Sequence, residues 1–279
     1  GVAVEEGPFY GQGVNHRESE FGFVTVRACL PKDQLLREKR VKISIGLALI
    51  ARLYDLDPVQ EAEIDDKTLI ANWKDSHTSI RIGRSMIVKP SWRHQLDSDH
   101  PVVLQIDPGL AFGTGYHPTT QLCLELIENL CPVEKLLDVG TGSGILSIAA
   151  AKLGTSSVVA IDVDPVSVQV AQSNAKDNHV DEQLEVMCST LEQLSFGKDK
   201  FMLVVANLYS NLLEDFVRMF YEALSTRGSL VVSGILLEQS AQVKRIFTSE
   251  GWFVKQELSL EDWVALVMVK EGRLCIDSL

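Results

Sequence analysis

Short apolar runs rich in β-branched residues alternate with helical stretches in the second half of the chain. After Pro118 these runs read LLDVG, VVAIDV, LEVMCS, FMLVVANL and SLVVSGI, and residues spaced three and four apart between them are typical of helices. Strands that alternate with helices form a parallel sheet with helices on both faces. The last two runs, WFVKQELSL and VALVMVK, have no helix between them and predict an antiparallel pair at the C-terminal edge of the sheet. The sequence therefore predicts a doubly wound α/β domain.

The chain before this region has a less regular pattern. A strand-like FGFVTVRACL and a helical VKISIGLALIARLYD predict a small α+β domain over residues 1–63. Residues 64–74, IDDKTLIANWK, contain no Gly or Pro and predict a linker helix, so residues 75–279 form the larger domain. The opening GVAVEEGP resembles a strand already under way and begins with Gly1 rather than Met, so we expect the small domain to be truncated.

Composition and charge restrict the class of protein. The 279 residues are 46% hydrophobic and 23% charged, as in a folded globular protein. A net charge of -12 argues against direct nucleic-acid binding and favours a cationic partner. The longest apolar run, residues 43–50, is shorter than the roughly 18 residues of a membrane span, so we expect a cytoplasmic protein without a membrane contact. Five cysteines lack the spacing of a metal site or a disulfide framework, and we expect no metal: Cys29, Cys123, Cys131, Cys188 and Cys275.

A glycine-rich turn follows the first strand of the large domain. The strand LLDVG, the turn TGSG and the helix ILSIAAAKLG form a nucleotide-type unit, in which Gly140, Gly142 and Gly144 let the backbone approach a ligand. A dinucleotide fingerprint would have its third glycine at Ile145, so NAD is disfavoured. The pattern DxGxGxG, which starts at Asp138, is the common form in S-adenosylmethionine enzymes. A glycine turn of purely structural use is the alternative.

The second strand of the large domain ends in an acidic residue. Asp162 lies 22 residues after Gly140, where a carboxylate can accept hydrogen bonds from both ribose hydroxyls. Alternatively, Asp162 or Asp164 caps the helix that starts at Pro165. We favour Asp164 as the cap and Asp162 as the ribose ligand.

The fourth strand, VVANL, ends in Asn207 at the same edge of the sheet. An uncharged amide offers both an acceptor and donors, which suits the orientation of an amine towards a methyl group. We therefore predict Asn207 as the catalytic residue, and we assign no dedicated base. The alternative is that Asn207 caps the helix that follows.

The stretch QIDPGLAFGTGYHPTT, residues 105–120, precedes the first strand. Its position predicts a loop that folds across the methionine end of the cofactor, with Phe112 as a lid and with Gly113 and Gly115 as pivots. Thr119 and Thr120 then open a helix whose N-terminal amides and hydroxyl can bind a carboxylate. For either threonine alone, an ordinary turn with an N-cap is the alternative.

The motifs DPGLAFGTGYHPTT, LLDVGTGSGILSIAAAKLG, AIDVDP, VVANL and SGIL together resemble the PrmA family, the methyltransferases of ribosomal protein eleven of the large subunit. They extend from about residue 80 to residue 237, and DPGxAFGTGxHxTT is highly specific. The resemblance implies an N-terminal substrate-recognition domain of ferredoxin-like type and a linker helix. It also implies a class I S-adenosylmethionine-dependent catalytic domain with a Rossmann-like seven-stranded sheet, which methylates lysine side chains and the α-amine of its protein substrate.

The resemblance also implies a set of cofactor contacts: Thr120, Gly140, Asp162 and Asn207, with Phe112, Gly113 and Thr114 as neighbours and Gly142 in the glycine turn. The chain departs from the family pattern after Asn207, where Leu208, Tyr209 and Ser210 replace the usual small apolar pair. We also expect the N-terminal domain to be without the first strand and helix of the family, and we therefore expect weak binding of the protein substrate.

The leading hypothesis is thus a protein methyltransferase that acts on this basic ribosomal protein. An N-methyltransferase with another protein or small-molecule acceptor is the nearest alternative, although residues 207–210 lack the NPPY of glutamine- and adenine-methylating enzymes. A nicotinamide-dependent oxidoreductase and a non-enzymatic ribosome-assembly module are the remaining hypotheses.

Overall fold

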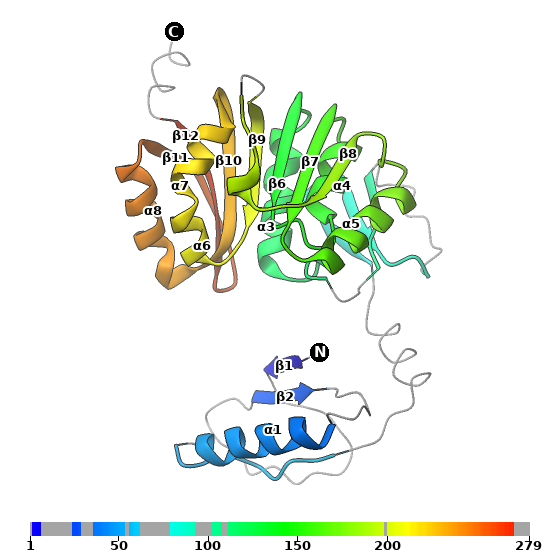
Figure 1. The fold of residues 1–279 in the computed structure, drawn as a ribbon, viewed down its shortest axis with the longest axis vertical. Helices are drawn as coiled ribbons and strands as arrows, with labels where there is room; N and C mark the ends of the chain where they lie inside the picture. The colour runs from blue at the N-terminus through cyan, green and yellow to red at the C-terminus, as the bar shows by residue number, and fades with distance from the viewer. Residues whose placement is uncertain are drawn as a thin grey trace. The chain divides into compact units, whose positions relative to one another are not determined.

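The computed structural model describes residues 2–6, 24–28, 36–53, 56–61, 79–92, 102–107, 111–197 and 200–270. The chain divides into two compact units, residues 1–64 and residues 65–279 (Figure 1). The linker helix predicted over residues 64–74 lies outside the described residues, so it stays a prediction.

The smaller unit contains two strands and a helix. Strands β1 (Val2–Glu6) and β2 (Val24–Ala28) pair antiparallel, which confirms the strands predicted there. Helix α1 (Leu36–Ile50) begins and ends earlier than the predicted VKISIGLALIARLYD. It begins early because its first turns consist of good helix formers, and the Glu38 Oε1 and Lys42 Nζ atoms lie 2.7 Å apart at the helical four-residue spacing. The ferredoxin-like assignment remains a prediction.

A three-stranded sheet opens the larger unit. Strand β4 (Met86–Lys89) pairs antiparallel with β3 (Ile80–Ile82) and parallel with β5 (Val102–Gln105). The apolar run in RSMIVKPSW, which Pro90 ends, predicts only β4 of these three strands. The turn between β3 and β4 is fixed by Glu128, whose carboxylate accepts hydrogen bonds from the backbone amides of Arg84 (2.8 Å) and Ser85 (2.7 Å).

The main sheet has seven strands in the order β11-β12-β10-β9-β6-β7-β8. Strands β6 to β10 are parallel, and β12 pairs antiparallel with both β10 and β11. The predicted doubly wound sheet and its antiparallel C-terminal pair are thus confirmed. The sequence pattern did not predict that β12 lies between β10 and β11 in the sheet. The strands are β6 (Lys135–Val139), β7 (Ser157–Asp162), β8 (Leu184–Cys188), β9 (Phe201–Asn207), β10 (Leu224–Leu236), β11 (Trp252–Leu260) and β12 (Trp263–Lys270).

Helices cover both faces of this sheet (Figure 1). One face carries α3 (Pro118–Leu130), α4 (Ile145–Lys152) and α5 (Pro165–Asp177), and the other carries α6 (Ser210–Asp215), α7 (Val217–Ala223) and α8 (Ser240–Ser249). Successive residues of a strand alternate between the two faces. In β6, Leu136 belongs to the core beneath α3 and α4, whereas Leu137 belongs to the opposite core. Asp138 therefore points to the α3 and α4 face.

Strands β6 and β9 are neighbours in the sheet, but β7 and β8 lie between them in the chain. The direction of winding reverses between these two strands. In open α/β sheets, ligands bind outside the carboxyl ends of the strands at such a point. The ends of β6 and β9 therefore define the place to look for a site.

Candidate active site

The glycine turn after β6 packs closely against two other segments. Gly140, Gly142 and Gly144 have φ values of 74°, 55° and 83°, which residues with a side chain rarely adopt. A Cβ on Gly142 would lie 2.5 Å from the carbonyl oxygen of Phe112, and one on Gly140 would lie 2.5 Å from a methyl group of Leu208. The positive φ values at both positions and the backbone contact at Gly142 therefore already favour glycine, in addition to any ligand.

The acidic residues after β7 have separate contacts. Asp164 caps α5 as predicted, and its carboxylate accepts hydrogen bonds from the Val166 amide (3.0 Å) and the Ser167 hydroxyl (3.1 Å). The half-buried Asp162 instead accepts a hydrogen bond from the Gly142 amide at 2.9 Å and another from the Asp164 amide at 3.0 Å. A carboxylate can accept about four hydrogen bonds, so Asp162 keeps acceptor capacity for ribose hydroxyls at the glycine turn.

The loop over residues 111–117 lies on the glycine turn, and its predicted place across the methionine end of a cofactor stays a prediction. The Phe112 carbonyl accepts a hydrogen bond from the Ser143 amide at 2.8 Å, and the Gly113 carbonyl accepts one from the Ser143 hydroxyl. Gly113 and Gly115 have φ values of 102° and 91°. The Phe112 side chain is 59% exposed. Residues 108–110, which open the motif, lie outside the described part of the chain.

The helix after this loop begins one residue earlier than predicted. Pro118 is its first residue and His117 is its N-cap, so the cap is not a threonine. The Nδ1 atom of His117 accepts a hydrogen bond from the Thr119 amide at 3.3 Å, and the His117 carbonyl accepts one from the Thr120 amide at 3.0 Å. These amides are thus already bonded within the protein, contrary to the prediction that they take a carboxylate.

The hydroxyl of Thr120 remains available. Thr120 is fully buried, and its Oγ1 atom has no hydrogen-bond partner within the described part of the chain. A buried polar atom left without a partner costs about 1–3 kcal/mol. This hydroxyl is therefore a candidate ligand contact, and it belongs to a residue that the sequence predicted for the cofactor.

Asp138 is a site residue that the sequence analysis did not select. It is fully buried, and its Oδ2 atom accepts hydrogen bonds from the Thr141 hydroxyl (2.7 Å) and the Ser147 hydroxyl (2.6 Å). Its Oδ1 atom has no partner among the described residues. Burial raises the pKa of Asp138 to about 6, and the charge of Asp162 acts in the same direction, against the two hydroxyl bonds. The available signal was a carboxylate inside the apolar run LLDVG.

Helix α3 packs against β9, β10 and β12, and against α4, which follows the glycine turn. Burial raises the pKa of the Cys123 thiol of α3, and the negative charge of Asp138 acts in the same direction, against a hydrogen bond with Ser233 of β10. Thr120 precedes Cys123 by three residues and therefore lies on the same side of α3. The α3 face of the sheet thus carries two buried oxygens without a partner among the described residues, Asp138 Oδ1 and Thr120 Oγ1.

Asn207 lies at the carboxyl end of β9, opposite Ser233 of β10. Helix α6 begins at Ser210 with Tyr209 at its N-cap position, which excludes the alternative that Asn207 caps this helix. The backbone after Asn207 is tightly held. The Leu208 amide donates a hydrogen bond to the Ser233 carbonyl at 3.1 Å, and a Cβ on Gly234 would lie 2.1 Å from the Leu208 carbonyl oxygen.

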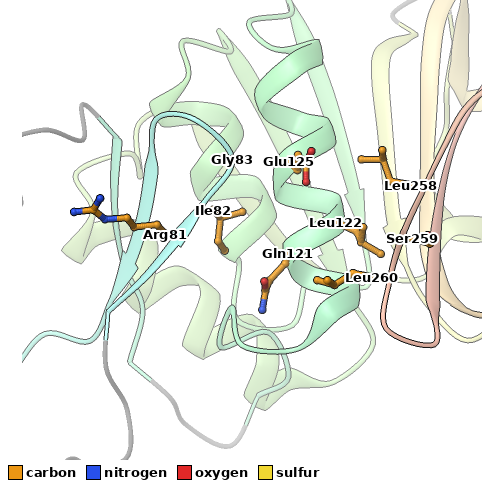
Figure 2. Close-up of a pocket in the computed structure, with 9 residues that line it drawn as sticks. All are labelled: Arg81, Ile82, Gly83, Gln121, Leu122, Glu125, Leu258, Ser259 and Leu260. Atoms are coloured by element: carbon orange, nitrogen blue, oxygen red, sulfur yellow. The ribbon is translucent and has the colours of Figure 1, made fainter.

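A pocket of about 350 Å³ lies between β3, the first half of α3 and the end of β11 (Figure 2). None of its lining residues belongs to the predicted site, so it is separate from the cofactor contacts described above. These residues are Arg81, Ile82, Gly83, Gln121, Leu122, Glu125, Leu258, Ser259 and Leu260.

Comparisons with known proteins identify the family. A family model described as "Ribosomal protein L11 methyltransferase (PrmA)" matches residues 9–271. The ribosomal protein L11 methyltransferase of Halalkalibacterium halodurans is 35% identical over 252 residues, which are 88% of this chain and 79% of that protein. That of Citrifermentans bemidjiense is 40% identical over 238 residues, which are 81% and 76% of the two chains.

A solved structure shares the fold. The ribosomal protein L11 methylase of Lactobacillus delbrueckii subsp. bulgaricus superimposes with a TM-score of 0.62 at 31% identity, over 69% of this chain and 98% of that one. The family match covers most of the chain. The chain belongs to the ribosomal protein L11 methyltransferase (PrmA) family.

Proposed function

We propose that this protein transfers methyl groups from S-adenosylmethionine to amino groups of ribosomal protein L11. Family membership supports the reaction and the substrate. The observation that carries the proposal within this chain is that two buried oxygens lack a partner among the described residues: Asp138 Oδ1, two residues before Gly140, and Thr120 Oγ1, in the first turn of α3. S-adenosylmethionine supplies the electrophilic methyl group when it is bound.

The methionine end of this cofactor fits the unpartnered atoms. It carries an α-ammonium and an α-carboxylate close together. Asp138 Oδ1 can accept a charge-assisted hydrogen bond from the ammonium, which also returns the Asp138 carboxylate to its charged form. The Thr120 hydroxyl can donate to the carboxylate near the positive end of the α3 dipole. Phe112 covers this end, with Gly113 and Thr114 in the same loop.

The ribose end fits the second strand. Asp162 would accept hydrogen bonds from the ribose hydroxyls. It would use the oxygen lone pairs that its bonds from two backbone amides leave available. Gly140 and Gly142 bring the backbone of the turn close to the ligand. We propose these contacts together with those of the methionine end.

Asn207 orients the acceptor amine. Its amide oxygen accepts a hydrogen bond from the amine, so the lone pair of the nitrogen can face the methyl group. A lysine has a pKa of about 10.4, so neutralising it at pH 7 costs roughly 4–5 kcal/mol. A desolvated site next to a sulfonium charge lowers that pKa. An α-amine, with a pKa of about 7.7–8.0, is the easier acceptor, and neither reaction needs a dedicated base.

The remaining assignments follow from this function. We propose that residues 1–63 recognise the protein substrate, that residues 64–74 link the domains and that residues 75–279 carry out catalysis. The net charge of -12 suits a basic protein substrate. The described residues contain no helix of the length and apolarity that a membrane crossing requires. We propose the cytoplasm, where the ribosomal substrate occurs, as the location.

The decisive experiment is the intact mass of ribosomal protein L11 after incubation with S-adenosylmethionine and this protein. We expect mass gains in whole methyl steps, and we expect Asp162→Ala to abolish them because the variant loses the ribose contact. Asp181→Ala, which makes the same change at an exposed position outside the site, should retain the gains. If the wild type binds the cofactor but the mass does not change, the ribosomal substrate is rejected.

A further inference from the structure

The ring of His117 lies between two other aromatic rings. Its centroid is 5.6 Å from that of Phe112 and 4.9 Å from that of Trp263, with interplanar angles of 62° and 67°. These are the edge-to-face arrangements that aromatic pairs prefer. Trp263 is the first residue of β12, so the contact joins the loop before α3 to the hairpin between β11 and β12. Figure 2 shows Leu260 of this hairpin beside Gln121 and Leu122 of α3.

His117 also fixes the start of α3. Its Nδ1 atom lies 3.3 Å from the Thr119 amide nitrogen and 2.8 Å from Thr119 Oγ1. A backbone amide can only donate, so Nδ1 carries no proton, the imidazole is neutral and Thr119 Oγ1 donates. Burial lowers the pKa of His117, against the opposing effect of Glu261, which agrees with a neutral ring. Ser, Thr, Asp and Asn are the usual N-caps, so a histidine here adds a ring that capping alone does not need.

Both contacts of His117 lead to the proposed methionine end of the cofactor site. The Phe112 backbone is held on the glycine turn by its bond from Ser143, and its largely exposed ring packs against the ring of His117. On the other side, Thr120 with its unpartnered hydroxyl lies in the helical turn that His117 caps. One side chain therefore contacts the predicted lid and caps the turn that carries the candidate cofactor hydroxyl.

We propose that His117 is a positioning residue for methyl transfer: its neutral ring, held against Trp263, places Phe112 and the first turn of α3 around the methionine end of the cofactor. This inference rests on the proposed function. It assigns to β12 a part in forming the site, although Trp263 is distant in sequence from every cofactor motif.

The test separates the ring of His117 from its capping group. His117→Asn keeps an N-cap acceptor and removes the ring. We expect a melting temperature near that of the wild type and a Kd for S-adenosylmethionine, measured by titration calorimetry, that is about ten- to a hundredfold higher. The KM for the cofactor should rise in parallel, and kcat at saturating cofactor should fall by less. His179→Asn, the same change at an exposed position, should leave the Kd, the KM and kcat unchanged.

A second set of variants tests whether His117 acts through its contacts with Phe112 and Trp263. Phe112→Leu should raise the Kd similarly. The double variant with His117→Asn should raise the Kd little further, because both changes remove the same contact between Phe112 and His117. Trp263→Leu changes no residue of α3, and it should raise the Kd even if His117→Asn folds poorly. An unchanged Kd in folded His117→Asn, or fully additive effects of His117→Asn and Phe112→Leu, would overturn this inference and leave the proposed function standing. A wild-type protein that binds no cofactor would overturn the proposed function as well.

Discussion

Replacement of Asp138 by Asn should stabilise the cofactor-free protein against unfolding. The same replacement should lower the methyl-transfer activity measured with cofactor. The pKa of Asp138 rises from 3.8 to about 6 in the folded protein, chiefly because of burial. A shift of about two units corresponds to about 3 kcal/mol of destabilisation when the carboxylate is charged. The oxygen of an asparagine can still accept the bonds from Thr141 and Ser147, and the charge is gone. The new amide hydrogens lack an acceptor among the described residues, so the net gain should be about 1–3 kcal/mol at pH 8.

The pH dependence identifies the cause. The folded-state pKa of Asp138 is above the unfolded value, so the folded state takes up the proton first as the pH falls through 6. The wild type therefore recovers stability in acid, and the variant has no such group. Between pH 8 and pH 4.5 the advantage of the variant should shrink by about 2 kcal/mol.

The assay is urea unfolding of the wild type and Asp138→Asn at both pH values, without cofactor. Asp181→Asn, an exposed control, should differ little from the wild type at either pH. Affinity for S-adenosylmethionine should fall in Asp138→Asn, because a neutral amide attracts the α-ammonium less. A stability difference between Asp138→Asn and the wild type that is the same at pH 8 and pH 4.5 would refute the role of the buried charge.

Two further substitutions test the glycine turn and the start of α3. Thr120→Val replaces a buried, unpartnered hydroxyl by a methyl group, so the free energy of unfolding should stay within about 1 kcal/mol or rise, while the calorimetric Kd for S-adenosylmethionine should increase about tenfold; tighter binding would contradict the assigned contact. Gly142→Ala brings a Cβ within 2.5 Å of a backbone oxygen at a φ of 55°, and it should destabilise the protein to urea by more than about 2 kcal/mol. Gly197→Ala, at a φ of 34° with no atom within 4 Å of its new Cβ, should cost less, and equal costs would show that the contact with Phe112 is not the cause.

The sequence predicted the parts of this protein that depend on local patterns. The seven-stranded sheet follows from apolar runs of β-branched residues, and the Asp164 cap follows from an aspartate directly before Pro165. The first residue of α3 was predicted wrongly, because a histidine can cap a helix when its ring is held neutral by neighbours that are remote in sequence. The sequence did not show that Asp138 Oδ1 and Thr120 Oγ1 both lack a partner, because the partners of a buried oxygen depend on the packing of the folded chain, which residue spacing does not encode.

The insertion of β12 between β10 and β11 has a consequence for how the protein is made. A ribosome synthesises β10 and β11 before β12, so these two strands lack their shared partner until the later segment emerges. The same segment delivers Trp263 to His117. A nascent chain that has all the cofactor motifs but not yet β12 thus lacks both the strand that joins β10 to β11 and the Trp263 ring that contacts His117.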